Sequence, residues 1–563
     1  MEMVGPDRVE HSRKHWLLAL AAVNLALVPI TASAARPPAP AVVNVSNSAN
    51  LAEGEETVSA NPRNPRDLLV GSNQWQPATP GNAGNVGVGA SGTTSCAVFD
   101  SHDGGGTWKG RRLGTAGFGE VSLPLPVPGS FHEFSDLGNL ISADQNTVWD
   151  NHGNVYYQCI YAGLHRSTPQ VWVFRSQDQG RTWSDPVVAF DEVSTGVQID
   201  RSFLAVDNSG GARDGTLYLT FETMFYQPAP AAVYVRSSDR NDWTNWGPPG
   251  VSRRVDDPAQ EAQWDPRQFP QVSPDGTLRV VYDAAPPTVS PCPCGPDTPA
   301  LIMASSTDGG NTFSHSVIDP RVKRIQSQDE AFNFFQEFIA AFAVDPTNAA
   351  RAAVAWPDGA SGEDRLLLRV TSDGGRTWSQ RLQLADDPPG KGNQHDHPAL
   401  SYLPDGTLVA VWRDRRFSDG KLGSPFDVFM RTGRAAASGL ALGPSLRLTS
   451  SSQPTTTGHH GNMPSEYLGL WGDVTGAEVS WDQLDPAGLL TDNYFTHVSA
   501  AQLPPADTAA AIMPRLLPRT AATAVPMAPA AALLVLGLAV LLAARRLLAG
   551  LDPGGPDEGQ RGH

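Results

Sequence analysis

The chain has 563 residues, a formal net charge of −17 at pH 7, 48 prolines and 54 glycines. The negative charge argues against a protein that tracks nucleic-acid phosphates, because such binding depends on a positive surface. The many turn-forming residues are typical of an all-β protein and not of a helical bundle. We therefore expect short strands and no nucleic-acid partner.

The N-terminus has the pattern of an export signal. Three basic residues within 8–14 precede an apolar run over 16–30, and small residues at 32–34 provide a cleavage site. An uncleaved anchor is the alternative, but the run is short for a membrane span. Residues 1–34 are therefore predicted to be a signal peptide that begins as a helix.

The C-terminal region has the pattern of a membrane anchor. An uncharged stretch over 521–544 is followed by Arg545 and Arg546, which predicts a transmembrane helix over 521–546 and a cytoplasmic tail over 547–563. The preceding LPRTA, over 517–521, resembles a sortase sorting signal with Ala in place of the expected Gly, so wall attachment is the alternative. Residues 501–520, rich in proline and alanine, would form a stalk. Either way, the rest of the chain is expected at the cell surface.

One octapeptide recurs along the chain. It reads SHDGGGTW over 101–108, SQDQGRTW over 176–183, STDGGNTF over 306–313 and TSDGGRTW over 371–378, with a shorter copy, SSDRNDW, over 237–243. Its aspartate can accept hydrogen bonds from the backbone of its own turn, and its glycines can take a positive φ. The four complete copies contribute Asp103, Asp178, Asp308 and Asp373 as structural residues. A spacing of roughly 65–75 residues indicates a repeat architecture.

This octapeptide resembles the Asp-box of the sialidase-like, or bacterial neuraminidase repeat, β-propellers. The resemblance covers roughly residues 55–498. It implies that each box lies on the outer rim, between the third and fourth strands of a blade and away from any active site. The motif is specific for the fold and much less so for activity, because non-enzymatic receptors also carry it.

A second repeated element indicates the number of blades. It is a hairpin of alternating apolar residues around a turn, and it occurs seven times: over 57–75, 147–163, 203–223, 269–284, 338–358, 398–414 and 467–483. The last two units lack a box but keep a third strand, FDVFMRT and DNYFTHV. We therefore predict a single all-β propeller of four-stranded blades over residues 35–500, with seven blades favoured over the six of sialidase enzymes.

The chain ends are expected to close the ring. The seventh unit has no outer strand after Val498, and an extended segment over 42–46 can supply one. This exchange would remove the exposed sheet edges that an open ring leaves.

The four cysteines suggest disulfides in an exported chain. Cys96 and Cys159 occupy strand-like runs of successive units and can pair. Cys292 and Cys294 are too close in sequence for relaxed bridge geometry, although a strained bridge remains open. The spacing of a zinc site is absent.

The first strand of every blade runs along the central channel, so residues entering these strands gather at one mouth. These positions are polar throughout: Glu56, Asp144, Asp200, Arg201, Arg267, Gln268, Glu337, His395, Asp396, His397, Glu466 and Tyr467. A single charged residue at a strand start is usually a solvated loop residue. Recurrence at one position in every unit predicts a functional site at this mouth.

The resemblance implies roles for some of these residues. Sialidases bind the sugar carboxylate with arginines, which matches Arg201 and Arg267, with Arg413 as a weaker third and His397 beside them. They use a tyrosine nucleophile activated by a glutamate and an aspartate as acid, an exception to the two-carboxylate glycosidase plan. By position, Tyr467, Glu337 and Asp200 would take these three catalytic roles. The family's Arg-Ile-Pro motif is missing before the first box, where the chain reads TTSCAVFD, so each role is a hypothesis.

A different class of function fits the same ring. Carboxylates are the ligands that Ca²⁺ prefers, and Glu56, Asp144 and Asp396 are the metal-ligand candidates. No cofactor is required for the hydrolase, whereas Ca²⁺ would stiffen a non-catalytic adhesion or protein-binding propeller. In both readings the partner is a glycan or glycoprotein, and we expect a monomer.

Four tryptophans recur on or beside the second strands. Trp149, Trp356, Trp412 and Trp481 could form a stripe for sugars, but packing between blades is favoured because each repeat must bury an apolar face.

Overall fold

The structure of the protein is a computed structural model. It describes residues 40–47, 52–75, 94–115, 119–122, 141–163, 166–191, 199–223, 232–248, 251–257, 269–284, 299–323, 340–419, 424–436, 439–454, 467–484 and 491–506. The predicted signal peptide, membrane helix and tail lie outside these residues. Within the described ranges no helix is long and apolar enough to cross a membrane.

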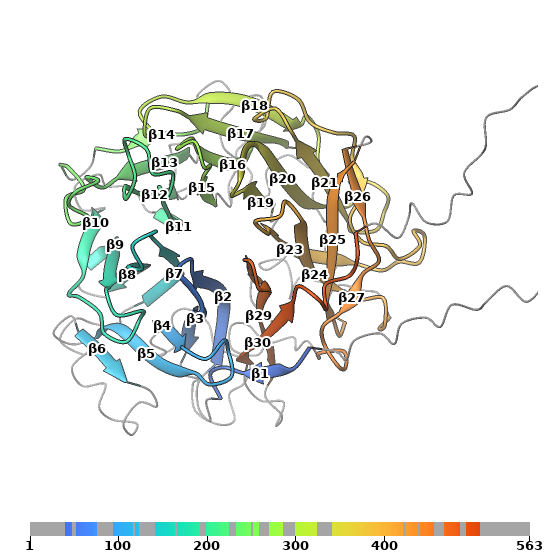
Figure 1. Ribbon diagram of the computed structural model, residues 1–563, viewed down its shortest axis with the longest axis horizontal. Coiled ribbons are helices and arrows are strands. Elements are labelled where there is room, and N and C mark those ends of the chain that lie inside the picture. Colours follow the sequence, from blue (N-terminus) through green and yellow to red (C-terminus); the bar gives the residue numbers. More distant parts are fainter. Residues whose placement is uncertain are drawn as a thin grey trace, which may run out of the picture. The chain divides into compact units, whose positions relative to one another are not determined.

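The described strands form seven antiparallel sheets around a central axis (Figure 1). Blade 1 consists of β2 (Ala52–Asn61), β3 (Asn64–Trp75), β4 (Thr94–Ser101), β5 (Lys109–Thr115) and β6 (Gly119–Ser122). Blade 2 consists of β7 (Ile141–Trp149), β8 (Val155–Gly163), β9 (Arg166–Ser176) and β10 (Val187–Asp191). Blade 3 consists of β11 (Ile199–Val206), β12 (Leu217–Thr223), β13 (Ala232–Ser237) and β14 (Arg253–Arg254). Blade 4 consists of β15 (Pro270–Val272), β16 (Leu278–Ala284), β17 (Ala300–Ser306) and β18 (Ser314–Asp319).

The remaining three blades follow the same order. Blade 5 consists of β19 (Ala341–Asp345), β20 (Asn348–Asp358), β21 (Arg365–Thr371) and β22 (Leu382–Gln383). Blade 6 consists of β23 (His395–Tyr402), β24 (Leu408–Asp414), β25 (Asp427–Ala436), β26 (Gly439–Leu442) and β27 (Leu446–Arg447). Blade 7 consists of β28 (Gly469–Gly472), β29 (Gly476–Leu484), β30 (Thr491–Ser499) and β1 (Val42–Asn44). The seven blades that the repeated hairpins predict are confirmed. Blade 1 adds β6 beyond its fourth strand, and in blade 6 both β26 and β27 pair with β25.

The N-terminal strand closes the ring. β1 pairs antiparallel with β30, so that Val42 lies opposite Thr496. The Val45 amide extends this pairing by donating to the Asn493 carbonyl at 2.7 Å. The predicted exchange of the outer strand of blade 7 is therefore confirmed.

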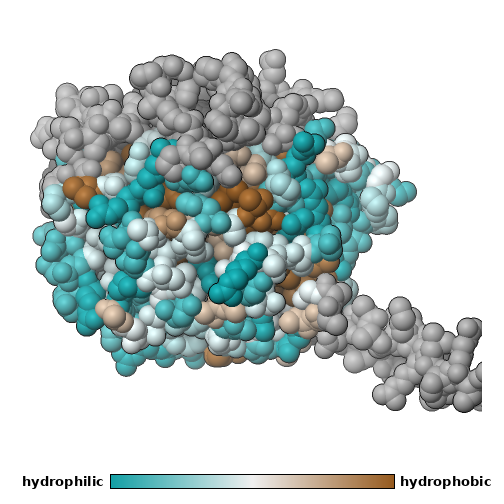
Figure 2. Space-filling model, turned by 90° about the horizontal axis from the view of Figure 1, so that it is seen from above, coloured by the Kyte–Doolittle hydropathy of each residue, from teal (hydrophilic) through white to brown (hydrophobic). Residues whose placement is uncertain are grey.

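The hydrophobic core lies between the blades. The described residues form seven buried clusters, and each cluster joins two neighbouring blades. Trp149, Trp356, Trp412 and Trp481 belong to four of these clusters and are at most 2% exposed. The packing role predicted for them is confirmed. The outer surface in Figure 2 is mostly hydrophilic, with separate hydrophobic patches.

The four complete octapeptides form one repeated turn between the third and fourth strands of blades 1, 2, 4 and 5. In the first copy, Asp103 accepts hydrogen bonds from the Thr107 amide at 2.9 Å and from its hydroxyl at 2.8 Å. The bond from the Thr107 amide lowers the pKa of Asp103 to about 2. Gly105 has a φ of 89°, and a side chain there would clash with the ring of Phe495. Asp178, Asp308 and Asp373 repeat the same bonds to the threonine four residues later.

Blades 1 and 2 are also linked covalently. Cys96 on β4 and Cys159 on β8 form a disulfide, with their Cα atoms 6.5 Å apart. The predicted pairing is confirmed, while Cys292 and Cys294 lie outside the described residues.

Candidate functional site

Four of the seven inner strands share one irregularity near their start. In β2, β7, β11 and β23 one extra residue on the inner strand shifts the register with the second strand, which is a β-bulge. Each bulge contains a non-glycine residue with φ between 50° and 62°: Glu55, Asp144, Arg201 and His397. This backbone conformation costs about 1–3 kcal/mol, and bulges of this kind redirect side chains. Backbone strain in the channel is therefore concentrated where the inner strands begin, a region that we call the inner-strand entry.

Three residues predicted for this mouth converge near the axis. Asp144 accepts the Arg201 backbone N–H at 2.8 Å through one carboxylate oxygen and the Tyr467 hydroxyl at 3.3 Å through the other. The Arg201 guanidinium forms an ion pair with Glu222 at 3.0 Å. All four side chains are buried. Blades 2, 3 and 7 thus meet at one tyrosine–carboxylate pair beside an arginine.

An aromatic layer lies at the same level. The ring of Tyr467 packs edge-on against Phe203 and Phe269, with centroid distances of 5.7 and 6.0 Å. Phe203 and Phe269 contact each other at 4.3 Å. The Tyr467 ring is therefore held by blades 3 and 4 while its hydroxyl faces Asp144.

A second group of charges lies on blades 6 and 7. Arg413 forms an ion pair with Asp482 at 2.9 Å, and Asp396 binds Arg415 at 2.6 Å and His397 at 2.8 Å. Burial alone would raise the pKa of Asp396, but Arg415 and His397 outweigh it and hold this pKa well below its usual range. Arg415 and His397 therefore favour the ionised form of Asp396.

Glu56 has the opposite character. Its side chain is fully buried, and burial, reinforced by the charge of Asp482, raises its pKa well above the usual range. Glu56, whose pKa is raised, therefore lies near Asp482, which forms an ion pair with Arg413. Two acids with such different environments can divide the roles of proton donor and anion.

The other predicted site residues are placed only in part. Asp200 lies on β11, where its backbone is described and its side chain is not. Arg267 and Glu337 lie outside the described residues. Among described groups, the carboxylate that contacts Tyr467 is Asp144, which sequence analysis considered only as a metal ligand.

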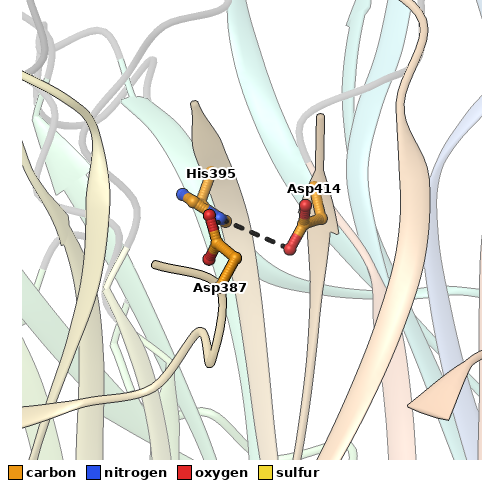
Figure 3. A group of neighbouring side chains, drawn as sticks. All are labelled: Asp387, His395 and Asp414. Atoms are coloured by element: carbon orange, nitrogen blue, oxygen red, sulfur yellow. Dashed lines mark ion pairs between the residues drawn. The ribbon is translucent and has the colours of Figure 1, made fainter. Parts of the chain in front are cut away.

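The metal candidates do not share a centre in the described part of the chain. Asp144 contacts Tyr467 and Arg201, whereas Asp396 contacts Arg415 and His397. The three-residue group with ligand atoms close together is a different one: Asp387, His395 and Asp414, from the segment after β22, from β23 and from the end of β24 (Figure 3). All three side chains are buried.

Cations that belong to the chain already occupy this group. His395 Nε2 lies 3.0 Å from Asp387 Oδ1 and 3.4 Å from Asp414 Oδ2. Arg416 Nη2 lies 3.8 Å and 2.7 Å from the same two oxygens. Burial alone would lower the pKa of His395, but the two carboxylates outweigh it and raise this pKa to about 9. An imidazolium and a guanidinium thus neutralise the carboxylates, and the group is best understood as an ionic clamp between blades 5 and 6.

Asp364 completes this clamp. Its carbonyl accepts the His395 amide at 3.0 Å and contacts His395 Nδ1 at 2.8 Å. Burial and the nearby charge of Asp396 raise the pKa of the Asp364 carboxyl to about 7. Sequence analysis missed Asp364, Asp387 and Asp414, and the one available signal was the dense charge of the run Arg413–Arg416 at the end of an apolar strand.

Comparisons with known proteins identify no family for this chain. No protein-family model and no curated protein matches the sequence. Solved structures that are similar in shape include the NanB sialidase of Streptococcus pneumoniae, with 12% identity, coverage of 83% of this chain and 71% of the other, and a TM-score of 0.40. The GH93 α-L-arabinofuranosidase of Fusarium graminearum is 14% identical, with coverage of 82% of this chain and 98% of the other and a TM-score of 0.39. The leech intramolecular trans-sialidase is 12% identical, with coverage of 80% of this chain and 68% of the other and a TM-score of 0.39. At this level of similarity, the assignment of a seven-bladed propeller rests on the sheet order of the chain itself.

Proposed function

We propose that this protein is a sialidase-like glycoside hydrolase that binds an acidic glycan at the inner-strand entry. The observation that carries the proposal is that Asp144 contacts both the Tyr467 hydroxyl and the Arg201 backbone N–H, while the Arg201 guanidinium is paired with the neighbouring Glu222. A phenol beside a buried carboxylate can serve as a nucleophile, and a guanidinium recognises a sugar carboxylate by paired hydrogen bonds. Arg267, Arg413 and His397 are proposed to assist in binding.

The proposed reaction has two balanced steps. The Tyr467 oxygen attacks the anomeric carbon as its proton passes to Asp144, and the glycosidic bond breaks as the leaving oxygen takes a proton from Asp200. Water then attacks the same carbon and releases Tyr467, and both carboxyls regain their starting protonation states. Glu337 is proposed to support the activation of Tyr467. Burial raises the pKa of Glu56 well above the usual range, so it is the second candidate acid.

The test uses a fluorogenic sialoside and the soluble chain over 35–510. This part contains all seven blades and the closing strand. We expect turnover that Tyr467→Phe lowers at least about 100-fold, because a general-base-activated nucleophile is lost. Arg201→Ala should mainly raise KM, because it removes a binding group.

The matched control is Tyr218→Phe, which removes a hydroxyl from a buried tyrosine of β12 outside the convergence. Its turnover should equal that of the wild type. Equal turnover of wild type and Tyr467→Phe would refute the nucleophile. EDTA should leave the rate unchanged, since no metal enters the proposed reaction.

A second function is favoured by a specific observation. Arg201 and Arg413 are each paired with a carboxylate of the chain, Glu222 and Asp482, so the charges of both guanidinium groups are already balanced. Binding of the sialoside without hydrolysis would select a glycan-recognition propeller. Binding of neither sialoside nor other glycans, with a calcium-dependent rise in melting temperature, would select the adhesion platform.

The proposed function includes a place outside the cell. The disulfide supports an oxidising compartment. We propose export by the N-terminal signal and attachment through the C-terminal helix or a wall-sorting step. The soluble part is proposed to act as a monomer.

A further inference from the structure

The channel contains a pocket beyond the aromatic layer. Its volume is about 420 Å³, and its walls come from all seven inner strands. Tyr467 and Phe269 line it, whereas Glu56, Asp144, Arg201 and His397 do not. The pocket therefore lies on the side of the layer toward which the inner strands run, where they turn into the second strands. It is distinct from the polar mouth.

The described walls of this pocket carry no charge. None of the described residues that line it is Asp, Glu, Lys, Arg or His. A charged ligand would lose its hydration there without gaining a counter-ion, and that loss is expensive. The pocket therefore selects against ions, in contrast to the mouth.

The side-chain amides in the wall are already satisfied. Asn146 donates to the Leu204 carbonyl at 3.0 Å and accepts the Leu204 amide at 2.9 Å. Gln271 bridges in the same way to the Phe342 carbonyl and the Val344 amide, both at 2.8 Å. These bonds tie neighbouring inner strands together, so the pocket walls are rigid.

Hydroxyl groups remain able to bind a ligand. Ser401 Oγ accepts the Gly472 amide at 3.0 Å, which leaves its own O–H to donate. Ser273 is 1% exposed, and its hydroxyl has no hydrogen-bond partner among the described residues. Buried polar groups without a partner are uncommon, so this serine calls for a ligand or water.

Trp471 adds an apolar surface. Trp471 is partly buried, packs against the cluster between blades 7 and 1, and is one of the residues that line the pocket. A rigid pocket of a few hundred Å³ with aromatic walls and a few hydroxyl groups is typical of a site for a small molecule. An uncharged sugar presents both an apolar C–H face and hydroxyl groups.

We propose that this pocket is a second binding site, which takes an uncharged sugar ring against Trp471. Tyr467 belongs to both sites, because its ring lines the pocket and its hydroxyl contacts Asp144. A sugar bound in the pocket would thus rest against the back of the polar mouth. The inference does not depend on hydrolysis at the mouth.

The experiment compares two probes that differ in charge. Binding of methyl β-D-glucopyranoside and of methyl β-D-glucuronide to the soluble chain is measured by ligand-observed NMR titration. We expect the neutral glycoside to bind with a Kd of about 1–10 mM and the glucuronide at least about 10-fold more weakly at this site. Trp471→Ala should weaken binding of the neutral probe at least about 10-fold, because the stacking surface is lost.

Two further variants keep the test decisive. Trp378→Ala, at a half-buried octapeptide tryptophan on the rim, should leave binding unchanged. Val344→Phe, which fills the pocket from another strand, should abolish it even if Trp471→Ala fails to fold. Absence of neutral-probe binding, equal affinity for both probes, or equal loss in Trp378→Ala would overturn the proposal and leave a channel that holds water only.

Discussion

At the scale of single residues, charge is buried only where the chain neutralises it. Asp396 is held ionised by Arg415 and His397, and the carboxylates of Asp387 and Asp414 face His395 and Arg416. Breaking such a pair is costly, because the remaining charge stays buried. These residues therefore hold blades 5 and 6 in register as well as shaping the mouth.

Asp364 should make the stability of the fold depend on pH. Its pKa in the folded protein is about 7, well above the ordinary value for aspartate. Between about pH 4 and pH 7 the folded state thus keeps a proton that the unfolded state releases. The contribution of Asp364 to the free energy of unfolding is therefore complete at low pH and declines as the pH rises to 7. Asp364→Asn should remove this decline and stabilise the protein at pH 8 by a few kcal/mol. Urea unfolding of both proteins at several pH values measures the free energy of unfolding and its dependence on pH.

The control for this prediction is Asp345→Asn, which changes another buried carboxyl of blade 5. It should leave the slope of stability against pH between 4 and 7 largely intact. An Asp364→Asn variant with the same slope as the wild type would show that this carboxyl titrates normally.

Sequence analysis identified only some of the residues at the mouth. Asp144, Arg201, His397 and Tyr467 were found because polar residues recur where inner strands begin. The ionic clamp was missed because its members are distant in sequence: His395 and Asp414 become neighbours only through the register of β23 with β24. Asp387 reaches them from the preceding segment, which no strand pattern describes.

At the scale of elements, the predicted hairpins match the observed ones, but four inner strands begin earlier than predicted. These strands are expected to start at residues 57, 147, 203 and 398, whereas β2, β7, β11 and β23 start at residues 52, 141, 199 and 395. Each missed portion contains a bulge, where the extra residue breaks the alternation of apolar and polar side chains. The same irregularity that hid the strand starts also shapes the candidate site.

The disulfide between blades 1 and 2 should contribute strongly to stability. It closes a loop with a sequence separation of 63 residues. The loss of chain entropy in the unfolded state predicts that the double variant Cys96→Ser, Cys159→Ser is less stable by about 4 kcal/mol. Denaturant unfolding measures this, and dithiothreitol should destabilise the wild type but not the variant. A difference below about 1 kcal/mol would show that blade packing alone fixes this interface.

At the scale of the whole molecule, counting hairpins predicted seven blades where the octapeptides alone suggested fewer. The hairpin count succeeds because every blade must present an apolar face to each neighbour, while the octapeptide turn is dispensable in blades 6 and 7.

Closure of the ring by β1 can be tested with two similar valines. Val45 is 5% exposed and packs in the cluster between blades 7 and 1, whereas Val42 is 39% exposed. Val45→Asp should destabilise the protein by about 3 kcal/mol or more, because it buries an unpaired charge. Val42→Asp should change stability by less than about 0.5 kcal/mol. Thermal unfolding of both variants measures the effect, and equal melting temperatures would contradict closure at this strand.

The pairing of β1 with β30 also determines when a newly made chain can become complete. Val42 is synthesised long before Thr496, yet the two residues lie side by side. A translation product that ends before β30 lacks the partner of β1 and leaves a sheet edge open to proteases and to other chains. Strand β30 therefore acts as a check on the completeness of the propeller, because only a chain that includes it can protect the N-terminal strand.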